Sequence, residues 1–328
     1  MRKNRVESTN GRTGGRRALW AALLGLVLAG PVMAAEVFEK VGTYDAQFLK
    51  IGVGARAAGM GGAYSAVAND PTSVFWNAAG IAGVAEDKTE FSLDHTEWPA
   101  GLNFDYAGVV FHVKGLPGAV AVHARSLSMK EEPVRTAFRP DGTGEFFDAG
   151  YAAYGLTYAR LLTDKFSVGL GANLVHMGLA DLSQQSVTFD LGTLYSVGTM
   201  GMKIAMAISN IGSPVTFIER EGRIPTMFRV GTSFQNDVDA DHHITGSFDF
   251  SHPPDNAERL NLGGEYAYKH FLYGRLGYNF NYDAETWAAG GGVEIPVSIS
   301  ETRAKLDYAY TDMSDLGGVH RFSLIIRF

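Results

Sequence analysis

The sequence contains no cysteine among its 328 residues. This absence excludes disulfide bonds, thiol nucleophiles and metal centres with cysteine ligands. Long hydrophobic runs are also missing, because no stretch after residue 34 reaches the ~18 consecutive apolar residues that a membrane-spanning helix needs. Any membrane insertion of the chain must therefore use strands.

Basic residues are scarce relative to acidic ones. The chain has 28 Lys and Arg against 35 Asp and Glu, a net charge of −7. Residues 1–34 hold six of the basic residues and one acidic residue, so 22 basic and 34 acidic residues follow, a net charge of −12. Because a nucleic-acid partner requires a basic footprint, we expect none.

The N-terminus has the pattern of a secretory signal peptide. Residues 1–17 are basic and polar, and residues 18–30 form an unbroken apolar and small-residue run. Val32-Met33-Ala34 offers small residues to a signal peptidase, which predicts a signal peptide over 1–34 with cleavage after Ala34 or Ala35. About 13 apolar residues are too few to span ~30 Å of hydrocarbon as a helix. An exported chain without a membrane helix is periplasmic, secreted or an outer-membrane barrel.

From Thr89 onward, apolar and polar residues alternate with a period of two, which predicts strands. The fourteen candidate strands are 89–95, 103–113, 118–128, 146–160, 165–177, 187–198, 201–210, 225–236, 241–251, 257–268, 271–283, 285–295, 301–312 and 317–328. Most are long enough to cross a membrane as tilted strands, which takes about 9–11 residues. An even number is typical of bacterial single-chain barrels.

The last strand gives the clearest pattern. Phe322, Leu324, Ile326 and Phe328 share one face, while Arg321 and the other polar residues fall on the opposite one. A terminal strand with one apolar face that ends in Phe is typical of an outer-membrane barrel, and these four residues are the candidate signal for the barrel-assembly machinery. The alternative is an edge strand of a soluble sandwich.

The lengths of the connections favour the barrel. If the last strand ends in the periplasm, the links predicted outside the cell are long and include 129–145, 178–186 and 211–224. The links predicted inside are short and include 115–117, 162–164, 198–200 and 269–270. Outer-membrane barrels have this asymmetry, whereas a propeller or sandwich has no reason to show it.

Residues 35–87 differ from the barrel region, predicted over 88–328. Small residues dominate and the alternation is missing, with a short helix expected over Ala55–Ala68 and another from Pro71 to a stop at Gly80. A barrel of this size has a lumen too wide for its own side chains to fill. We therefore predict an all-β fold, a transmembrane antiparallel β-barrel of about 14 strands whose lumen is plugged by residues 35–87.

The run from Phe48 to Gly80 resembles the hallmark N-terminal segment of the PorV/PorQ family, within the wider FadL-like group of outer-membrane barrels. In that family the segment ends in Asn-Pro-Ala-Gly inside the barrel, and Asn77-Ala78-Ala79-Gly80 departs from it only by Ala78. The resemblance covers about 35 residues, and the barrel matches only in pattern. The plug-motif candidates are Gly52, Gly54, Arg56, Gly59, Asn69, Asp70, Pro71, Trp76, Asn77 and Gly80.

Enzyme chemistry finds no support in the sequence. Residues 52–57 fit a loose G-x-G-x-x-A dinucleotide pattern, but no clear strand precedes it and no βαβ unit follows. The acidic run 237–241 lacks the central Gly and closing Glu of a calcium loop. We therefore expect no catalytic residue, cofactor or metal. Lys50 and Arg56 are expected to pair with lumen carboxylates such as Asp307 or Glu265.

Three functions remain open for such a barrel. The family resemblance implies a non-enzymatic carrier or accessory component for exported proteins, as in type IX secretion. The alternatives are FadL-like passive transport of long-chain fatty acids or other hydrophobic compounds, and a structural barrel. The expected partners are outer-membrane lipid, the barrel-assembly machinery, and either exported cargo proteins or a hydrophobic small ligand.

Overall fold

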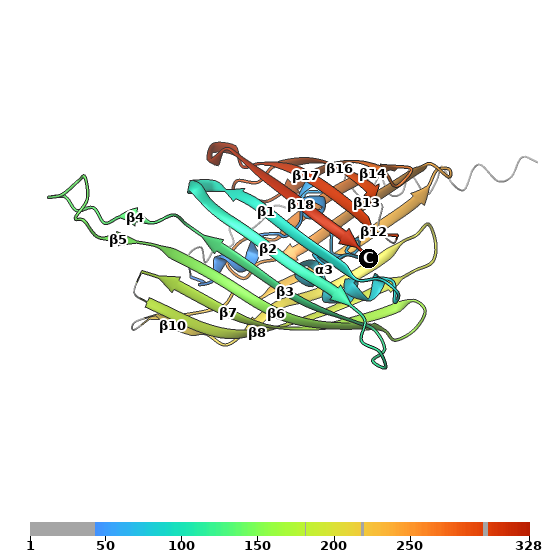
Figure 1. Cartoon of the computed structure of the whole chain (residues 1–328), viewed down its shortest axis with the longest axis horizontal. Coiled ribbons are helices and arrows are strands. Elements are labelled where there is room, and N and C mark those ends of the chain that lie inside the picture. The colour runs from blue at the N-terminus through green and yellow to red at the C-terminus, as the bar shows by residue number, and fades with distance from the viewer. Residues whose placement is uncertain (1–42, 181, 218–219, 298–300) are drawn as a thin grey trace, which may run out of the picture. The chain divides into compact units, whose positions relative to one another are not determined.

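The computed structural model describes residues 43–180, 182–217, 220–297 and 301–328 (Figure 1). These residues belong to one unit, Glu39–Phe328. The predicted signal peptide and its cleavage positions, Ala34 and Ala35, lie outside the described residues. Among the described residues, no helix is long and apolar enough to cross a membrane.

Fourteen antiparallel strands form a closed barrel, which confirms the predicted fold class. Each strand pairs with the barrel strands that precede and follow it along the chain. The barrel strands are β1 (Glu90–Trp98), β2 (Leu102–Phe111), β3 (Ala119–Ser128), β6 (Ala149–Leu161), β7 (Phe166–Leu179), β8 (Leu182–Ser196), β9 (Lys203–Gly212), β12 (Met227–Asp237), β13 (His242–His252), β14 (Arg259–Tyr268), β15 (Leu272–Phe280), β16 (Trp287–Pro296), β17 (Arg303–Asp312) and β18 (Gly318–Arg327).

The barrel closes where β1 meets β18. Glu90 lies opposite Arg327, and Glu97 lies opposite His320 at the other end of the pair. Arg327 Nε donates a hydrogen bond of 2.9 Å to Glu90 Oε1, so an ion pair joins the first and last strands. Because every strand edge is paired, the barrel exposes no open ladder of backbone groups at this seam.

The period-two alternation places apolar side chains outside and polar ones inside. On β18, Phe322 is half-exposed, whereas Arg321 and Ser323 are buried. On β17, Leu306 faces outward while Lys305 and Asp307 are buried. A soluble protein would reverse this arrangement, because its strands bury apolar residues and expose charged ones. The barrel wall therefore has the polarity of a membrane barrel.

One predicted long connection is wrong. The range 178–186 is not a loop, because β7 ends at Leu179, β8 begins at Leu182, and these two residues pair with each other. The polar residues after Leu182 continue the ladder of strand hydrogen bonds beyond the apolar band, since a strand needs only a backbone partner there. This extension makes β7 and β8 the two longest strands, with 14 and 15 residues.

Two other predicted long connections carry small hairpins. The link after β3 contains β4 (Glu132–Pro133) paired with β5 (Phe146–Phe147). The link after β9 contains β10 (Val215–Phe217) paired with β11 (Arg220–Gly222). Two further links contain short 3₁₀ turns. These are η3 (Pro99–Gly101), between β1 and β2, and η4 (Ser314–Leu316), between β17 and β18.

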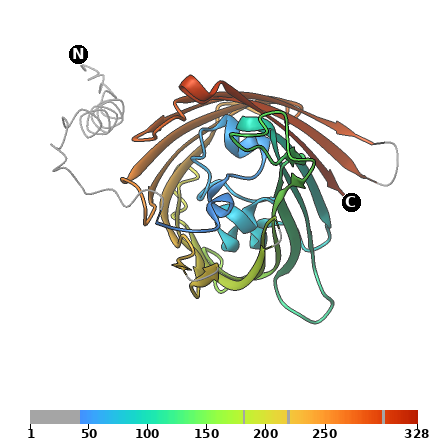
Figure 2. The ribbon, with the colours of Figure 1, turned by 90° about the vertical axis from the view of Figure 1, so that its left-hand side faces the viewer.

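The N-terminal elements lie inside the ring of strands, drawn in blue in Figure 2. They are η1 (Gln47–Lys50), α2 (Ala55–Gly59), α3 (Ser73–Trp76) and η2 (Ala78–Gly83). We call residues 43–84 the inner segment. Its large buried side chains, including Leu49, Met60 and Tyr64, form the main hydrophobic core together with inward residues of the strands.

Both helices expected in the inner segment are shorter than predicted. The helix over Ala55–Ala68 ends at Gly59, because Gly61 and Gly62 adopt φ of +63° and +76° and turn the chain. The second helix splits at Asn77, whose φ of −162° is extended. Gly80 consequently lies inside η2 rather than stopping a helix.

Glycines of the barrel wall allow the inner segment to approach closely. A methyl group at Gly169 would overlap the backbone of Ala78, and one at Gly192 would overlap the Asn77 side chain. On the opposite wall, a methyl group at Gly277 would overlap the backbone of Gly61. The high glycine content therefore has a packing reason, since backbone meets backbone in the lumen.

Candidate functional site

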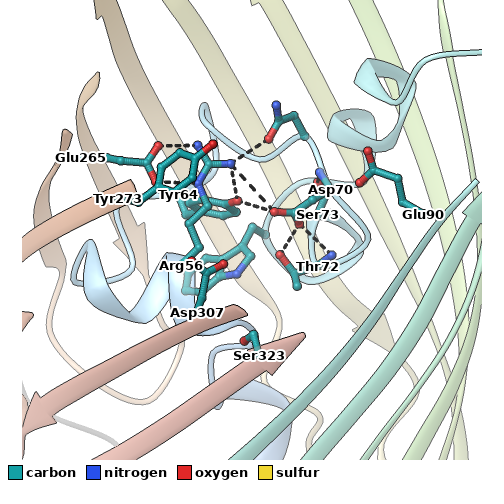
Figure 3. A network of polar contacts seen from close by, with 12 residues as sticks. Arg56, Tyr64, Asp70, Thr72, Ser73, Glu90, Glu265, Tyr273, Asp307 and Ser323 are labelled. Carbon is teal, nitrogen blue, oxygen red and sulfur yellow. Dashed lines mark hydrogen bonds and ion pairs between the residues drawn. The ribbon is translucent and has the colours of Figure 1, made fainter. Parts of the chain in front are cut away.

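The inner segment is tied to the barrel wall by a group of buried charges, which we call the paired-ion cluster (Arg56, Glu265, Arg275 and Asp307). Figure 3 labels Arg56, Glu265 and Asp307 of this cluster. Arg56 Nε and Nη2 donate to the two carboxylate oxygens of Glu265 at 2.9 and 2.7 Å. Arg275 donates to Glu265 and to Asp307 at 2.7 Å each. The predicted pairing of Arg56 with Glu265 is confirmed, whereas Asp307 is bound by Arg275 instead.

Arg56 has further partners within its own segment. Its Nη1 donates to Asn69 Oδ1 at 2.9 Å and to the Tyr64 hydroxyl at 3.2 Å, and that hydroxyl donates to Asp70 Oδ2 at 2.6 Å (Figure 3). Burial alone would lower the pKa of the Arg56 guanidinium, but Glu265, Tyr64 and Asp70 outweigh it and raise the pKa well above its ordinary value. Arg56 therefore remains a fixed charge.

Asp70 organises the turn that leads into α3. Its Oδ1 accepts from the backbone N–H of Thr72 at 2.9 Å and from the Thr72 hydroxyl. The Asp70 N–H donates to Ser73 Oγ at 3.0 Å, and the carbonyl of Pro71 accepts from the Tyr106 hydroxyl at 2.6 Å. These bonds hold the turn that precedes a very short helix and fix it to β2.

Asn77 links the inner segment to the opposite wall. Its Oδ1 accepts from the Ala79 N–H at 3.1 Å, and its Nδ2 donates to the carbonyls of Ser65 and Thr193 at 3.2 and 3.0 Å. A methyl group at Gly80 would lie 2.6 Å from the Ala68 carbonyl oxygen. The side chain of Asn77 thus anchors this turn through three hydrogen bonds. Ala78 stands there in place of the proline of the PorV/PorQ segment that the sequence resembles.

Trp76 packs against the glycine-rich start of the motif. Its Nε1 donates to the Val53 carbonyl at 2.9 Å, and its ring would lie 3.0 Å from a methyl group at Gly52. Gly54 has φ of +89°, and Gly59 packs against Gly290 of β16. The motif residues therefore hold the inner segment's shape and its contacts with the wall. A functional role for them stays a prediction.

Lys50 pairs with a carboxylate that the sequence did not single out. Its Nζ lies 2.9 Å from Asp255 Oδ2, and Gln47 Nε2 donates to the same oxygen at 2.8 Å. Asp255 lies in the link between β13 and β14. Burial alone would raise the pKa of Asp255, but the hydrogen bonds from Lys50 and Gln47 outweigh it and hold the pKa below its ordinary value.

A second group of lumen charges lacks such partners, and we call it the open arginine cluster (Arg229, Arg259 and Arg321). These side chains line a cavity of about 90 Å³ beside Phe75 and Trp76. In the described part of the chain, no carboxylate oxygen lies within 4.0 Å of their guanidinium nitrogens. The sequence placed Arg321 on the polar face of the last strand, but the alternation carried no signal that it converges with Arg229 and Arg259.

The members of the open arginine cluster make neutral contacts instead. Arg229 lies 5.0 Å from the Phe75 ring centroid and 5.5 Å from that of Trp76. Arg259 lies 4.3 Å from the ring centroid of Tyr282, and Arg321 Nε donates to Thr96 Oγ1 at 2.9 Å. Arg229 Nη1 also donates to the Phe75 carbonyl at 3.5 Å and to Ser209 Oγ at 3.4 Å. Cation–π contacts and neutral acceptors compensate a buried cation only in part.

The closed barrel of fourteen antiparallel strands is a fold that the chain shares with solved bacterial proteins. No family model matches the sequence, and no curated protein matches it. Among solved structures, the chain is similar to the Ralstonia pickettii toluene transporter TbuX, with 14% identity, 84% of this chain and 97% of the other covered, and a TM-score of 0.57. It is also similar to a Pseudomonas aeruginosa FadL homologue, with 10% identity, coverage of 84% and 98%, and a TM-score of 0.53.

The Pseudomonas putida toluene transporter TodX is a third structural neighbour, with 12% identity, 87% and 98% of the two chains covered, and a TM-score of 0.53. At these identities the likeness establishes a shared fold. The FadL-like fold is thus supported, whereas nothing in these comparisons supports the narrower PorV/PorQ resemblance or its secretion role.

Proposed function

We propose that this protein is a non-enzymatic outer-membrane channel for the passive passage of hydrophobic small compounds. The observation that carries the proposal is the likeness, over most of both chains, to barrels named as toluene transporters and as a FadL homologue. This favours the predicted alternative of FadL-like transport over the carrier role in protein secretion, which none of these three neighbours supports.

The outer face of the barrel supports a location in the outer membrane. Leu170, Leu276 and Leu306 are 56%, 70% and 56% exposed, and many other aliphatic and aromatic residues share this face. In water such a surface would cost about 25 cal/mol for each Å² of apolar area, whereas hydrocarbon removes this cost. The signal peptide expected over 1–34 would direct the chain to the same compartment.

The position of the inner segment supports a role as a plug. It lies within the ring of strands, and Figure 2 shows it across the lumen from one wall to the other. Passage of a compound through the barrel requires this segment to move or to leave a path beside it. The paired-ion cluster and the Lys50–Asp255 pair are among the contacts that join it to the barrel.

Uptake by whole cells tests the proposal. Gram-negative cells without a channel of this kind would express the full chain, and uptake of radiolabelled toluene and of oleate would be measured at equal barrel content. We expect faster uptake of at least one of these compounds than in cells with the empty vector. A hydrophilic sugar of similar size serves as the control, and its uptake should not change.

Fractionation supplies the second half of the test. The folded barrel should sediment with outer membranes and dissolve only in detergent, and unboiled protein should migrate differently from boiled protein on a gel. A folded barrel in the outer membrane that accelerates neither toluene nor oleate uptake would contradict the channel proposal. Recovery of the chain in the soluble periplasmic fraction would contradict the proposed location as well.

A further inference from the structure

The cavity beside Phe75 and Trp76 has an unusual chemical composition. Its walls combine the open arginine cluster with aromatic rings from the inner segment and from Tyr282. Arg229 and Arg321 are each 6% exposed, so their charges are held in a buried setting. The Nε of Arg259 is also buried, and it has no hydrogen-bond partner among the described residues. A buried guanidinium with a free N–H group calls for an acceptor.

Two carboxylates also line the cavity, and neither serves as the missing partner. Asp249 Oδ2 accepts from the backbone N–H groups of Tyr64 and Ser65 at 3.2 and 2.8 Å, so it is directed at the inner segment. Glu285 lies beyond 4.0 Å from the described guanidinium groups. Burial raises the pKa of Glu285 against the opposing charges of Arg259 and Arg321.

The charge balance indicates the charge of the missing ligand. The three arginines of the open cluster face Asp249 and Glu285, while Lys50, which also lines the cavity, is neutralised by Asp255. One positive charge remains uncompensated when both carboxylates are ionised. A ligand with one negative charge therefore completes the balance, whereas a divalent anion such as phosphate would exceed it.

The size and the walls of the cavity limit the rest of the ligand. Its volume of about 90 Å³ is below the ~150 Å³ of a cavity that holds benzene. The rings of Phe75 and Trp76 offer an apolar surface next to the guanidinium of Arg229. The space thus suits a short aliphatic chain with an anionic end.

We propose that this cavity binds a short-chain monocarboxylate, with its carboxylate accepting hydrogen bonds from Arg229, Arg259 and Arg321 and its aliphatic part against Phe75 and Trp76. Arginine suits this task because its planar donors match the two oxygens of a carboxylate. The binding site itself is independent of the channel proposal. The consequence that such acids are among the compounds transported rests on that proposal.

Binding can be measured with the full mature chain purified in a zwitterionic detergent. Sodium butyrate would be titrated while tryptophan fluorescence is recorded, because Trp76 lines the cavity. The neutral isostere butyramide tests whether the charge matters, and benzoate tests the size limit. We expect saturable binding of butyrate, and at least tenfold weaker binding of both butyramide and benzoate.

The variants Arg259→Gln and Arg321→Gln each remove one donor to the carboxylate. We expect each to weaken butyrate binding by about tenfold to a hundredfold, since hydrogen bonds to charged groups contribute about 1.5–3 kcal/mol. Arg303→Gln is the matched control, because Arg303 lies outside the cavity and pairs with Glu294. Its butyrate affinity should equal that of the wild type. Gel mobility of unboiled protein shows whether each variant is folded.

The outcomes separate this inference from the channel proposal. Absence of butyrate binding, equal binding of butyramide, or unchanged affinity in both folded arginine variants would overturn the carboxylate site. If toluene or oleate uptake is nevertheless accelerated, the channel proposal stands alone. Butyrate binding that depends on Arg259 and Arg321, without uptake of any tested compound, would retain the site and reject the channel.

Discussion

The paired-ion cluster and the open arginine cluster are built from the same residue type and lie in the same lumen. In the first, guanidinium nitrogens of Arg56 and Arg275 reach carboxylate oxygens at 2.7–2.9 Å. In the second, no described carboxylate lies within 4.0 Å of a guanidinium. The first cluster therefore ties the inner segment to the barrel wall, whereas the second presents guanidinium groups without a carboxylate partner among the described residues.

The difference has a physical basis in desolvation. Removing a charge from water costs several kcal/mol, and a well-oriented opposite charge offsets much of that cost. Breaking a satisfied pair is consequently expensive, whereas removing an unsatisfied charge relieves a cost that the folded protein already bears. Substitutions in the two clusters should therefore change stability by different amounts.

The largest effect is expected for Glu265→Gln in the paired-ion cluster. The change removes the carboxylate charge that Arg56 and Arg275 share, and it leaves Arg56 with only the weaker ion pair to Asp70, at 4.0 Å. Loss of one partner of a buried pair lowers the free energy of unfolding by about 3–5 kcal/mol. Urea unfolding of the barrel, followed by tryptophan fluorescence, measures the change.

The control for this prediction is Arg303→Gln, which breaks the more exposed Arg303–Glu294 pair. Such a pair contributes about 0–1 kcal/mol. Equal destabilisation by the two substitutions would show that the paired-ion cluster has no special role in holding the inner segment.

A smaller loss of stability is expected at a contact between uncharged groups of the barrel wall and the inner segment. A methyl group at Gly263 would lie 2.5 Å from the Met60 carbonyl oxygen and 2.9 Å from Met60 Cβ, whereas one at Gly264 would meet nothing within 4 Å. Gly263→Ala should lower the free energy of unfolding by about 1–3 kcal/mol because it overpacks the contact.

Gly264→Ala is the matched control for this position, since the neighbouring residue points to the other face of β14. It should leave the free energy of unfolding unchanged or slightly raised, because alanine reduces the freedom of the unfolded chain. Equal losses in both variants, measured in the same urea titration, would mean that the inner segment does not press on the wall here.

A still smaller effect is expected in the open arginine cluster. Arg259→Gln removes a cation–π contact with Tyr282 that is worth about 0.5–1 kcal/mol, and it also removes the desolvation cost of an unpaired charge. The free energy of unfolding should fall by no more than about 1 kcal/mol. A loss as large as that for Glu265→Gln would mean that Arg259 has a structural partner after all.

The smallest effect is a dependence of stability on pH through Asp255. Its pKa is lowered in the folded protein, so its contribution is fully present above the unfolded pKa of about 3.9 and is lost as pH falls through the folded value. Asp255→Asn should therefore reduce stability at pH 6 and make no difference at the most acidic pH. Thermal unfolding at both pH values checks this, and a difference that persists unchanged in acid would contradict it.

The strands were predictable because each one alternates apolar side chains, which face outward, with polar side chains, which face the lumen. On β17 and β18, Leu306 and Phe322 alternate with Asp307 and Arg321, and a period of two needs no tertiary information to be read. The extension of β8 back to Leu182 was missed, since polar residues that pair beyond the apolar band leave no alternation. Its composition distinguished the inner segment from the barrel, but the path of its backbone could not be predicted.

The sequence predicted that Arg56 pairs with a lumen carboxylate such as Glu265, because a charge among small apolar residues requires a partner. The choice of Asp255 for Lys50 was not, since that carboxylate lies in a link some 205 residues away and nothing local marks it. The convergence of Arg229, Arg259 and Arg321 was equally hidden, because three different strands supply them.

By itself, the sequence determined the strands: side chains on alternate faces of each strand must meet either hydrocarbon or the lumen, and fourteen segments with this alternation predicted a barrel. Only the tertiary structure decided which of the described lumen charges have a carboxylate partner and which do not. Strand register and the path of the inner segment set those distances, and both arise from contacts between residues far apart in the chain.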